Sequence, residues 1–199
     1  MFFFRYFATA KKGIHVNLII DIGNTACKLA VFEQGEIRET LRCSNQSLEG
    51  ISALCERYPI RKGILSSVIS ISEEIRQQLN QLPFPVMEFT YKTPVPIKNL
   101  YETPQTLGVD RLAAVVAAFT QKPYCPALVI DAGTCITYDF IDELGQYQGG
   151  NISPGMDMRF KALHTFTDKL PLVNVYGPTP DYGKSTETAI RSGIIKGIE

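Results

Sequence analysis

The sequence predicts an α/β protein in which one strand–turn–strand unit occurs twice. Two segments support this prediction: "LIIDIGNTACKLAVFEQGE", which begins at Leu18, and "LVIDAGTCITYDFIDELGQ", which begins at Leu128. Each consists of an apolar strand, an Asp-x-Gly-Asn/Thr turn, a second strand and a hairpin turn that contains glycine. Two such units predict a duplicated domain with a cleft between its halves. The alternative is that two buried hairpins resemble each other by chance.

Apolar runs rich in β-branched residues predict the strands of the first half, and apolar residues at helical spacing predict its helices. Ser72 is the expected N-cap of the second helix, and Pro83 its end. The segment 84–104 holds several prolines and is predicted to be mostly extended or loop. The predicted strands are Asn17–Ile20, Lys28–Phe32, Ile37–Cys43 and Lys62–Ile69, and the predicted helices are Leu48–Tyr58, 72–82 and Arg111–Thr120.

The second half is predicted to hold two strands and two helices. Its strands are expected at Ala127–Ile130 and Ile136–Ile141, with a turn over Asp142–Gln146. Its helices are expected at Met156–Leu163 and at Ser185–Ile198, with Ser185 or Thr186 as the N-cap of the latter. We therefore expect three parts: an irregular N-terminal extension over residues 1–16, a first domain over 17–120 and a second domain over 121–199.

The composition is that of a globular protein without a dominant charge. The chain has 199 residues, of which 45% are hydrophobic, and its 20 basic residues balance 20 acidic ones. This balance argues against nucleic acid or an anionic membrane as a partner, and no apolar run approaches the roughly 20 residues of a membrane span. The five cysteines are odd in number and show no CxxC spacing, and the two histidines form no cluster. These features predict reduced thiols in a cytoplasmic protein with no zinc site.

The Asp-x-Gly-Asn/Thr turns have the residues that phosphate binding needs. A strand-end aspartate such as Asp21 or Asp131 can hold a metal ion, and the following glycine lets backbone N–H groups approach a ligand closely. Lys28 adds a charge that can reach a phosphate. Two facing loops of this kind would hold a polyphosphate from both sides. The alternative for either loop alone is an Asx turn, in which the aspartate binds its own backbone.

Two further segments bear on phosphate chemistry. "GPTPDYGKS", Gly177–Ser185, resembles a P-loop, but it has one residue too many between its glycines and two prolines that lack an N–H donor. We interpret it as a turn leading into the last helix. In "LGVDR", Asp110 and Arg111 stand where a loop enters an Ala-rich helix. Asp110 is either an N-cap or the group that takes a proton from a substrate hydroxyl; Arg111 is either a surface residue or an anion-binding one.

Five motifs, in order along the chain, resemble those of type III pantothenate kinases, which belong to the actin/hexokinase-like phosphotransferases. The resemblance covers residues 17–199, and at its last motif Ser185 stands where the family pattern has Asn. The motifs are "DIGNTACK" from Asp21, "YETPQTLGVDR" from Tyr101, "DAGTCITYD" from Asp131, "GGNISPGMDMRFKALHTFTDKLP" from Gly149 and "STETAIRSGI" from Ser185.

The resemblance implies two duplicated ribonuclease H-like domains and ATP-dependent phosphorylation of pantothenate to 4′-phosphopantothenate, the first step of coenzyme A synthesis. It also implies Mg²⁺, a monovalent cation (K⁺ or NH₄⁺) held by Asp131, and a homodimer with the substrate site at its interface. Asp110 would be the proton acceptor. The ATP phosphates and Mg²⁺ would be bound by Asp21, Ile22, Gly23, Asn24, Thr25, Ala26, Cys27 and Lys28, with Thr134 closing on them. Pantothenate would be bound by Tyr101, Gly108, Val109, Asp110, Arg111 and Thr186.

Two other classes of function stay open from the sequence. An acetate or sugar kinase relative would use the same Asp-x-Gly-Thr loops, although the Gly-Val-Asp-Arg element argues against it. A regulatory relative would bind nucleotide without turnover, although Asp21, Asp110 and Asp131 are all in place. The chain stops at Glu199, inside its last predicted helix, whereas the family continues further. We therefore expect the second domain to be incomplete.

Overall fold

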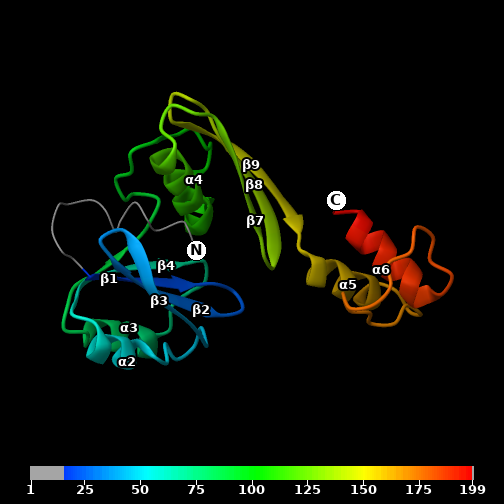
Figure 1. The fold of residues 1–199 in the computed structure, drawn as a ribbon, viewed down its shortest axis with the longest axis horizontal. Coiled ribbons are helices and arrows are strands. Elements are labelled where there is room, and N and C mark those ends of the chain that lie inside the picture. Colours follow the sequence, from blue (N-terminus) through cyan, green and yellow to red (C-terminus); the bar gives the residue numbers. More distant parts are fainter. Residues whose placement is uncertain (1–15, 199) are drawn as a thin grey trace. The chain divides into compact units, whose positions relative to one another are not determined.

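The computed structural model describes residues 16–198 as a mixed α/β protein with two sheets (Figure 1). The predicted N-terminal extension lies outside the described residues except for Val16, which begins the first strand. The strands are β1 Val16–Ile22, β2 Cys27–Glu33, β3 Glu36–Cys43, β4 Ile60–Ser67, β5 Val86–Glu88, β6 Lys98–Asn99, β7 Ala127–Ala132, β8 Cys135–Ile141 and β9 Gln146–Pro154. The helices are α2 Ile51–Arg57, α3 Glu73–Asn80, the 3₁₀ turn η2 Pro104–Thr106, α4 Val109–Gln121, α5 Met156–Thr165 and α6 Thr186–Lys196.

The first sheet has the strand order β3-β2-β1-β4-β5. Strands β1, β2 and β3 form an antiparallel meander, whereas β1, β4 and β5 run parallel. Gln34 and Gly35 join β2 to β3 with φ angles of 55° and 83°. Two positive φ values in a row are typical of the hairpin turns whose twist matches that of the flanking strands. The turn predicted between these strands is confirmed.

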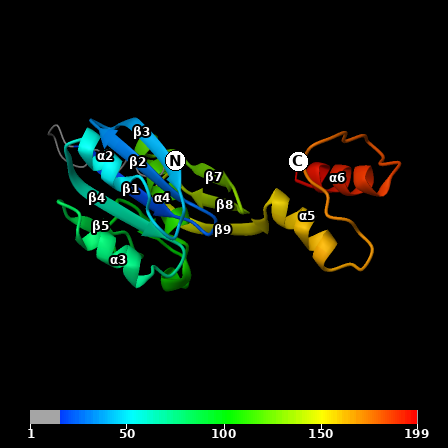
Figure 2. The same cartoon turned by 90° about the horizontal axis from the view of Figure 1, so that it is seen from below.

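The two faces of the first sheet pack against different helices, because side chains alternate along each strand. On one face, Leu18, Ile20 and Ile22 join a core with residues of α2 and α3. On the other face, Ile19 joins a core with α4, which supplies Leu112 among others. Figure 1 shows α4 on one side of this sheet and α2 and α3 on the other, and Figure 2 shows the α2–α3 side from below. Asp21 lies on the α4 face, two residues after Ile19.

Helices α2 and α3 are shorter than predicted, whereas α4 extends beyond the predicted Arg111–Thr120 at both ends. Helix α2 begins at Ile51 and not at Leu48, because Leu48 and Gly50 adopt left-handed φ angles of 45° and 96°. Ser72 is the N-cap of α3, as predicted: its Oγ accepts a hydrogen bond from the N–H of Ile75 at 3.4 Å. Helix α3 ends at Asn80, three residues before Pro83.

The second sheet has the strand order β6-β9-β8-β7 and includes a strand that the sequence did not predict. Strand β9 covers Gln146–Pro154, where consecutive glycines and a proline lower the strand propensity. It lies between β8 and β6 in the sheet, and its register partners on β6 are Lys98 and Asn99. Strand β7 is less buried than predicted: Ala127 and Val129 pack on the α4 core, but Leu128 and Ile130 are 60% and 57% exposed.

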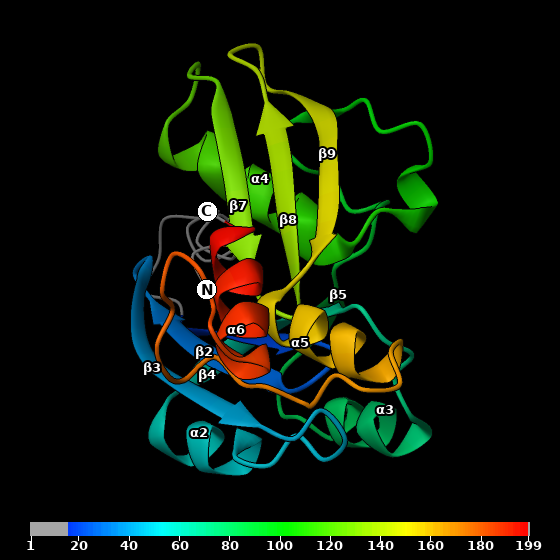
Figure 3. The same cartoon turned by 90° about the vertical axis from the view of Figure 1, so that its right-hand side faces the viewer.

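The chain divides into two compact units. The first holds residues 16–129 and Asp139–Gly149; the second holds Ile130–Tyr138 and residues 150–198. The division therefore falls within β7, β8 and β9. In the second unit α5 and α6 lie side by side (Figure 3) and share a small core around Phe160 and Ile190. Ser185 is the N-cap of α6, and it exchanges hydrogen bonds with Thr188 in a capping box.

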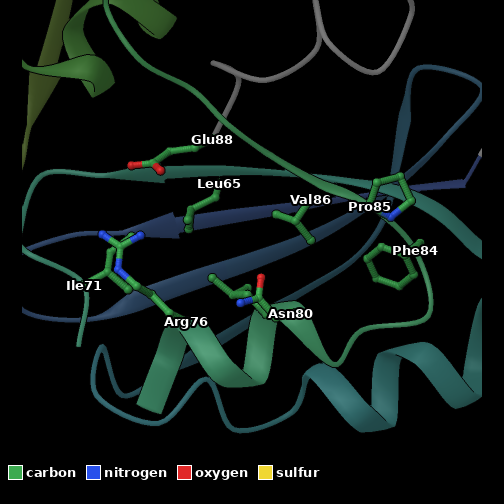
Figure 4. Close-up of a pocket in the computed structure, with 9 residues that line it drawn as sticks. Leu65, Ile71, Arg76, Asn80, Phe84, Pro85, Val86 and Glu88 are labelled. Atoms are coloured by element: carbon green, nitrogen blue, oxygen red, sulfur yellow. The ribbon is translucent and has the colours of Figure 1, made fainter. Parts of the chain in front are cut away.

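Helix α3 and the edge strand β5 enclose a pocket of about 270 Å³ (Figure 4). Its lining includes Leu65, Leu79 and Phe84, which belong to the α2–α3 core. The pocket therefore opens on the face of the first sheet opposite to Asp21. Among residues 16–198, no helix is both long enough and apolar enough to cross a bilayer.

Candidate active site

The first Asp-x-Gly-Asn/Thr turn places an acid and a base side by side on the first sheet. Asp21 lies within β1, one residue before its end, and its register partner on β2 is Lys28. Side chains at paired positions of an antiparallel ladder share one face, so the two opposite charges are neighbours on the α4 side. The tight turn between them is closed by a hydrogen bond of 3.0 Å from the N–H of Gly23 to the carbonyl of Ala26.

Asn45, which the sequence did not single out, supports this turn. Its side-chain amide donates hydrogen bonds to the carbonyls of Gly23 at 3.1 Å and Asn24 at 3.0 Å. Both carbonyls are thereby drawn toward Asn45. Because it lies 21 and 22 residues along the chain from its partners, nothing in the local pattern marked it. In the sequence, the one sign of a role for Asn45 is that a polar amide follows shortly after β3.

Ser66 is a second unpredicted neighbour of Asp21. It is the register partner of Asp21 on the parallel strand β4, so it lies on the same face of the sheet. Ser66 is fully buried, and its Oγ has no hydrogen-bond partner among the described residues. An unsatisfied buried hydroxyl is uncommon and costs free energy. Beside Asp21, the sheet therefore holds a buried hydroxyl whose hydrogen-bonding capacity is unused among the described residues.

The cysteine at the other end of the turn is a buried structural residue. Cys27 has no exposed surface, and it is the register partner of Cys43 on β3. Burial, followed by the neighbouring Cys43 thiol and the charge of Asp21, raises the pKa of the Cys27 thiol far above its ordinary value. Cys27 therefore stays a protonated thiol packed in the α2–α3 core.

The Gly-Val-Asp-Arg element forms the start of α4. Gly108 is the N-cap, so the interpretation of Asp110 as N-cap is wrong; Asp110 stands in the first turn instead. Its Oδ1 accepts a hydrogen bond of 2.8 Å from the backbone N–H of Arg111. A carboxylate in the first turn of a helix is stabilised by the helix dipole. Asp110 is partly buried.

Arg111 is buried, and the interpretation of it as a surface residue is wrong. Its side chain is 5% exposed and faces Asp139 on β8, which is 1% exposed. Nε lies 3.0 and 3.1 Å from the two oxygens of Asp139, and Nη2 lies 2.6 Å from Oδ1. Tyr147 on β9 donates its hydroxyl to the same Oδ1 at 2.6 Å and accepts from Nη2 at 3.1 Å. These five hydrogen bonds among three side chains tie α4 to β8 and β9.

Tyr101 closes this cluster from the loop after β6. Its ring is stacked on the ring of Tyr147, with centroids 6.1 Å apart and an angle of 9° between the planes. The guanidinium carbon of Arg111 lies 5.6 Å from the Tyr101 centroid. The backbone N–H of Tyr101 also donates to Oδ1 of Asn99 at 2.9 Å. We call Tyr101, Arg111, Asp139 and Tyr147 the Arg111 cluster.

The charges of the Arg111 cluster are mutually stabilising. Burial alone would lower the pKa of Arg111, but the hydrogen bond and charge of Asp139 reverse this and raise it. Burial, together with the hydrogen bond to Asp139, raises the pKa of the Tyr147 hydroxyl. Arg111 therefore keeps its positive charge and Tyr147 its proton at neutral pH.

The other predicted site residues lie in the second unit. Asp131 is an exposed residue of β7, and Thr134 is an exposed residue of the turn before β8. The carbonyl of Thr134 accepts a hydrogen bond of 3.0 Å from the N–H of Gly155, so the second Asp-x-Gly-Thr turn and the Pro-Gly element are in contact. Thr186 is exposed at the start of α6. Because Asp21 belongs to the first unit, a two-sided phosphate clamp stays a prediction.

The P-loop-like segment forms no phosphate loop. Residues 177–185 are irregular and lead into α6 through its N-cap, Ser185, which confirms that they form a connection. The carboxylate–lysine pair of Asp21 and Lys28 remains the phosphate-binding candidate of the first unit. Together with the aspartate at the start of α4, this pair is what an α/β enzyme that transfers phosphate would be expected to contain.

Comparison with known proteins makes this class specific. Residues 17–199 match the family of type III pantothenate kinases. A type III pantothenate kinase of Phocaeicola vulgatus is 62% identical over 184 residues, which are 92% of this chain and 76% of the relative. Those of Bacteroides fragilis and Christiangramia forsetii are 59% and 45% identical, with the same two coverages. The chain belongs to the type III pantothenate kinase family.

One solved structure supports the fold independently of sequence. A Baf family protein from Campylobacter jejuni superposes with a TM-score of 0.55 at 22% identity, over 91% of this chain and 75% of the other. At this identity the likeness shows the fold alone. The mixed α/β architecture with two sheets is thus found in a solved protein.

Proposed function

We propose that the chain phosphorylates the terminal hydroxyl of pantothenate with ATP as the phosphate donor, and that Asp110 accepts the hydroxyl proton. The observation that supports this most directly is the turn that begins α4. There the Asp110 carboxylate is partly buried, oriented by the Arg111 N–H and placed at the positive end of a 13-residue helix. This is the position and the chemistry of a base that orients an attacking hydroxyl.

In the proposed reaction, the pantothenate hydroxyl oxygen bonds to the γ-phosphorus of ATP while the bond from that phosphorus to the β–γ bridging oxygen breaks. ADP leaves with the bonding electron pair, and the hydroxyl proton goes to Asp110. Such transfers depend mainly on positioning and on stabilisation of charge. Lys28 would contribute positive charge toward the phosphates, and the backbone of the Gly23–Ala26 turn would contribute N–H donors.

The residues around Asp21 fit a magnesium ion. Mg²⁺ prefers oxygen ligands, and it is usually held by one or two carboxylates together with substrate phosphates. No group of three or more His, Cys, Asp or Glu side chains in the described part of the chain could hold a metal ion by itself. Asp21 would therefore supply the single carboxylate. When bound, Mg²⁺ offsets the negative charge of the phosphates.

The remaining assignments follow the family pattern. Thr134 would bind the ATP phosphates, Asp131 would hold the K⁺ or NH₄⁺ ion, and Thr186 would contact pantothenate. Residues 17–120 and 121–199 would be the two duplicated actin/hexokinase-like domains, in a cytoplasmic homodimer. The family membership of residues 17–199 supports each of these assignments.

A substrate comparison tests the proposed function against its alternatives. ADP release is measured with a coupled assay in which the chain receives ATP and Mg²⁺ with pantothenate, acetate or a hexose, each with and without K⁺. We expect ADP release with pantothenate only, stimulated by K⁺. Release with acetate or a hexose would indicate another kinase of the superfamily. ATP binding without any turnover would indicate a regulatory relative, and either result overturns the proposal.

A further inference from the structure

We propose that Asp139 and Tyr147 are positioning residues: they hold Arg111, and through it the turn that carries Asp110, in the geometry needed for phosphoryl transfer. This inference rests on the proposed role of Asp110. Neither residue belongs to the set predicted to touch ATP, cation or pantothenate. Both act through Arg111, and their side chains are buried behind the site.

Arg111 is joined to Asp110 both by the peptide bond and by a hydrogen bond. Arg111 follows Asp110 directly, and its backbone N–H donates to the Asp110 carboxylate at 2.8 Å. The guanidinium at the far end of the same residue is fixed by Asp139 on both Nε and Nη2. A planar fork bound at two nitrogens cannot rotate freely, so its anchor constrains the whole side chain. The backbone that orients Asp110 is thus held from inside the core.

Asp139 is itself held in place by Arg111 and Tyr147. Its Oδ1 receives hydrogen bonds from Nε, from Nη2 and from the Tyr147 hydroxyl. The Tyr147 hydroxyl accepts from Nη2 as well, so the three side chains form a closed ring of hydrogen bonds. Such a buried ring holds Asp139 and the guanidinium in one orientation. The loss of one member leaves the others buried without partners.

The same network also contacts Tyr101, which is predicted to bind pantothenate. Tyr101 stacks on Tyr147 and covers the Arg111 guanidinium. Tyr147 also pairs with Asn99 across β6 and β9, and the Asn99 side chain binds the Tyr101 backbone. One buried cluster therefore sets the positions of Tyr101, Asp110 and Arg111. The bidentate contacts use Nε and Nη2, which leaves the Nη1 side of Arg111 to face other groups.

The test compares two cluster variants with a surface control. Asp139→Asn keeps the shape of the side chain but removes its charge, and Tyr147→Phe keeps the stacking on Tyr101 but removes the hydroxyl. Glu39→Gln is the control, because it removes a carboxylate that pairs with Arg57 at 2.8 Å, where the arginine side chain is 51% exposed. For each protein, kcat, the KM values for ATP and pantothenate, the ATP dissociation constant and the thermal midpoint are measured, with kcat expressed per ATP-binding molecule.

A displacement of reacting groups by 1 Å can cost about 100-fold in rate. We therefore expect kcat of Asp139→Asn to fall by about 100-fold, with a raised KM for pantothenate and unchanged ATP affinity. Tyr147→Phe should show the same pattern to a smaller degree, and Asp139→Glu, which restores the charge, should recover part of the lost kcat. Glu39→Gln should match the unaltered protein.

Each result decides the proposal. Cluster variants that melt at lower temperature but keep kcat per ATP-binding molecule would show a purely structural network and overturn it. If Asp139→Asn does not fold, Tyr147→Phe decides by the same criterion. If the unaltered chain does not turn over pantothenate, the proposed function is wrong, and the inference that rests on it is wrong as well. Normal turnover in both the unaltered protein and the cluster variants overturns the positioning role alone.

Discussion

Gly108→Ala is expected to abolish most turnover while leaving the fold intact. A Cβ built on Gly108 would lie 2.5 Å from Oδ1 of Asp110. To reach ordinary van der Waals distance, the carboxylate oxygen must retreat by about 1 Å, which is enough to cost about 100-fold in rate if Asp110 receives the substrate proton. Gly108 has φ −55° and ψ 125°, which any residue can adopt, so the backbone itself gains no strain.

The stability change should be small because two effects oppose each other. Alanine is a poorer N-cap than glycine, which costs up to about 1 kcal/mol, and it reduces the entropy of the unfolded chain, which gains a similar amount. The matched control is Gly193→Ala in α6, where an added Cβ meets nothing within 4 Å. Steady-state phosphorylation of pantothenate and thermal melting are measured for both variants. Full turnover in Gly108→Ala would refute the reasoning, as would a loss that merely follows unfolding.

Three further predictions address the framework around the site. Ser72→Ala removes the N-cap of α3 and should lower the free energy of unfolding by about 1 kcal/mol, as measured in urea; an unchanged midpoint would contradict the cap. Exposed Cys125 should react with iodoacetamide well before Cys27, whose raised pKa and burial keep it protonated. Because folding favours the protonated thiol of Cys27, raising the pH beyond the ordinary thiol pKa of about 8.5 should lower the free energy of unfolding. Equal labelling rates of the two cysteines at pH 9 would argue against this. Gly155→Ala drives a Cβ into the backbone carbonyls of Gly133 and Thr134 and should destabilise the protein by about 1–3 kcal/mol; a wild-type melting temperature would show that this turn can move.

Local patterns predicted most of the first sheet but only β7 and β8 of the second. Strand β1 was evident from Leu18–Ile20, because both faces of that strand are buried and few other structures tolerate such an apolar run. Strand β9 was missed because Gly149 and Gly150 weaken the pattern. One of its neighbours in the sheet is β6, and the paired residues Lys98 and Gln146 lie 48 residues apart in the sequence, which no local pattern shows.

The site shows the same division between local and long-range information. Asp21, Lys28 and Asp110 could be found because each stands in a short motif with a chemical reason for its spacing. The burial of Arg111 could not, because its partner Asp139 lies 28 residues away. One signal was available: Asp139 is a charged residue inside the apolar strand "CITYDFI", and a carboxylate in such a place needs a buried partner.

The most direct test of the account is the turnover of Asp110→Asn at saturating ATP and pantothenate, together with its affinity for ATP. The amide keeps the shape of the side chain but cannot accept the hydroxyl proton, so kcat should fall by about 10²–10⁴-fold while ATP binding is unchanged. Asp168→Asn, at an exposed position after α5, is the control and should behave as the unaltered protein does. Turnover of Asp110→Asn close to that of this control would contradict the assignment of Asp110 as the proton acceptor.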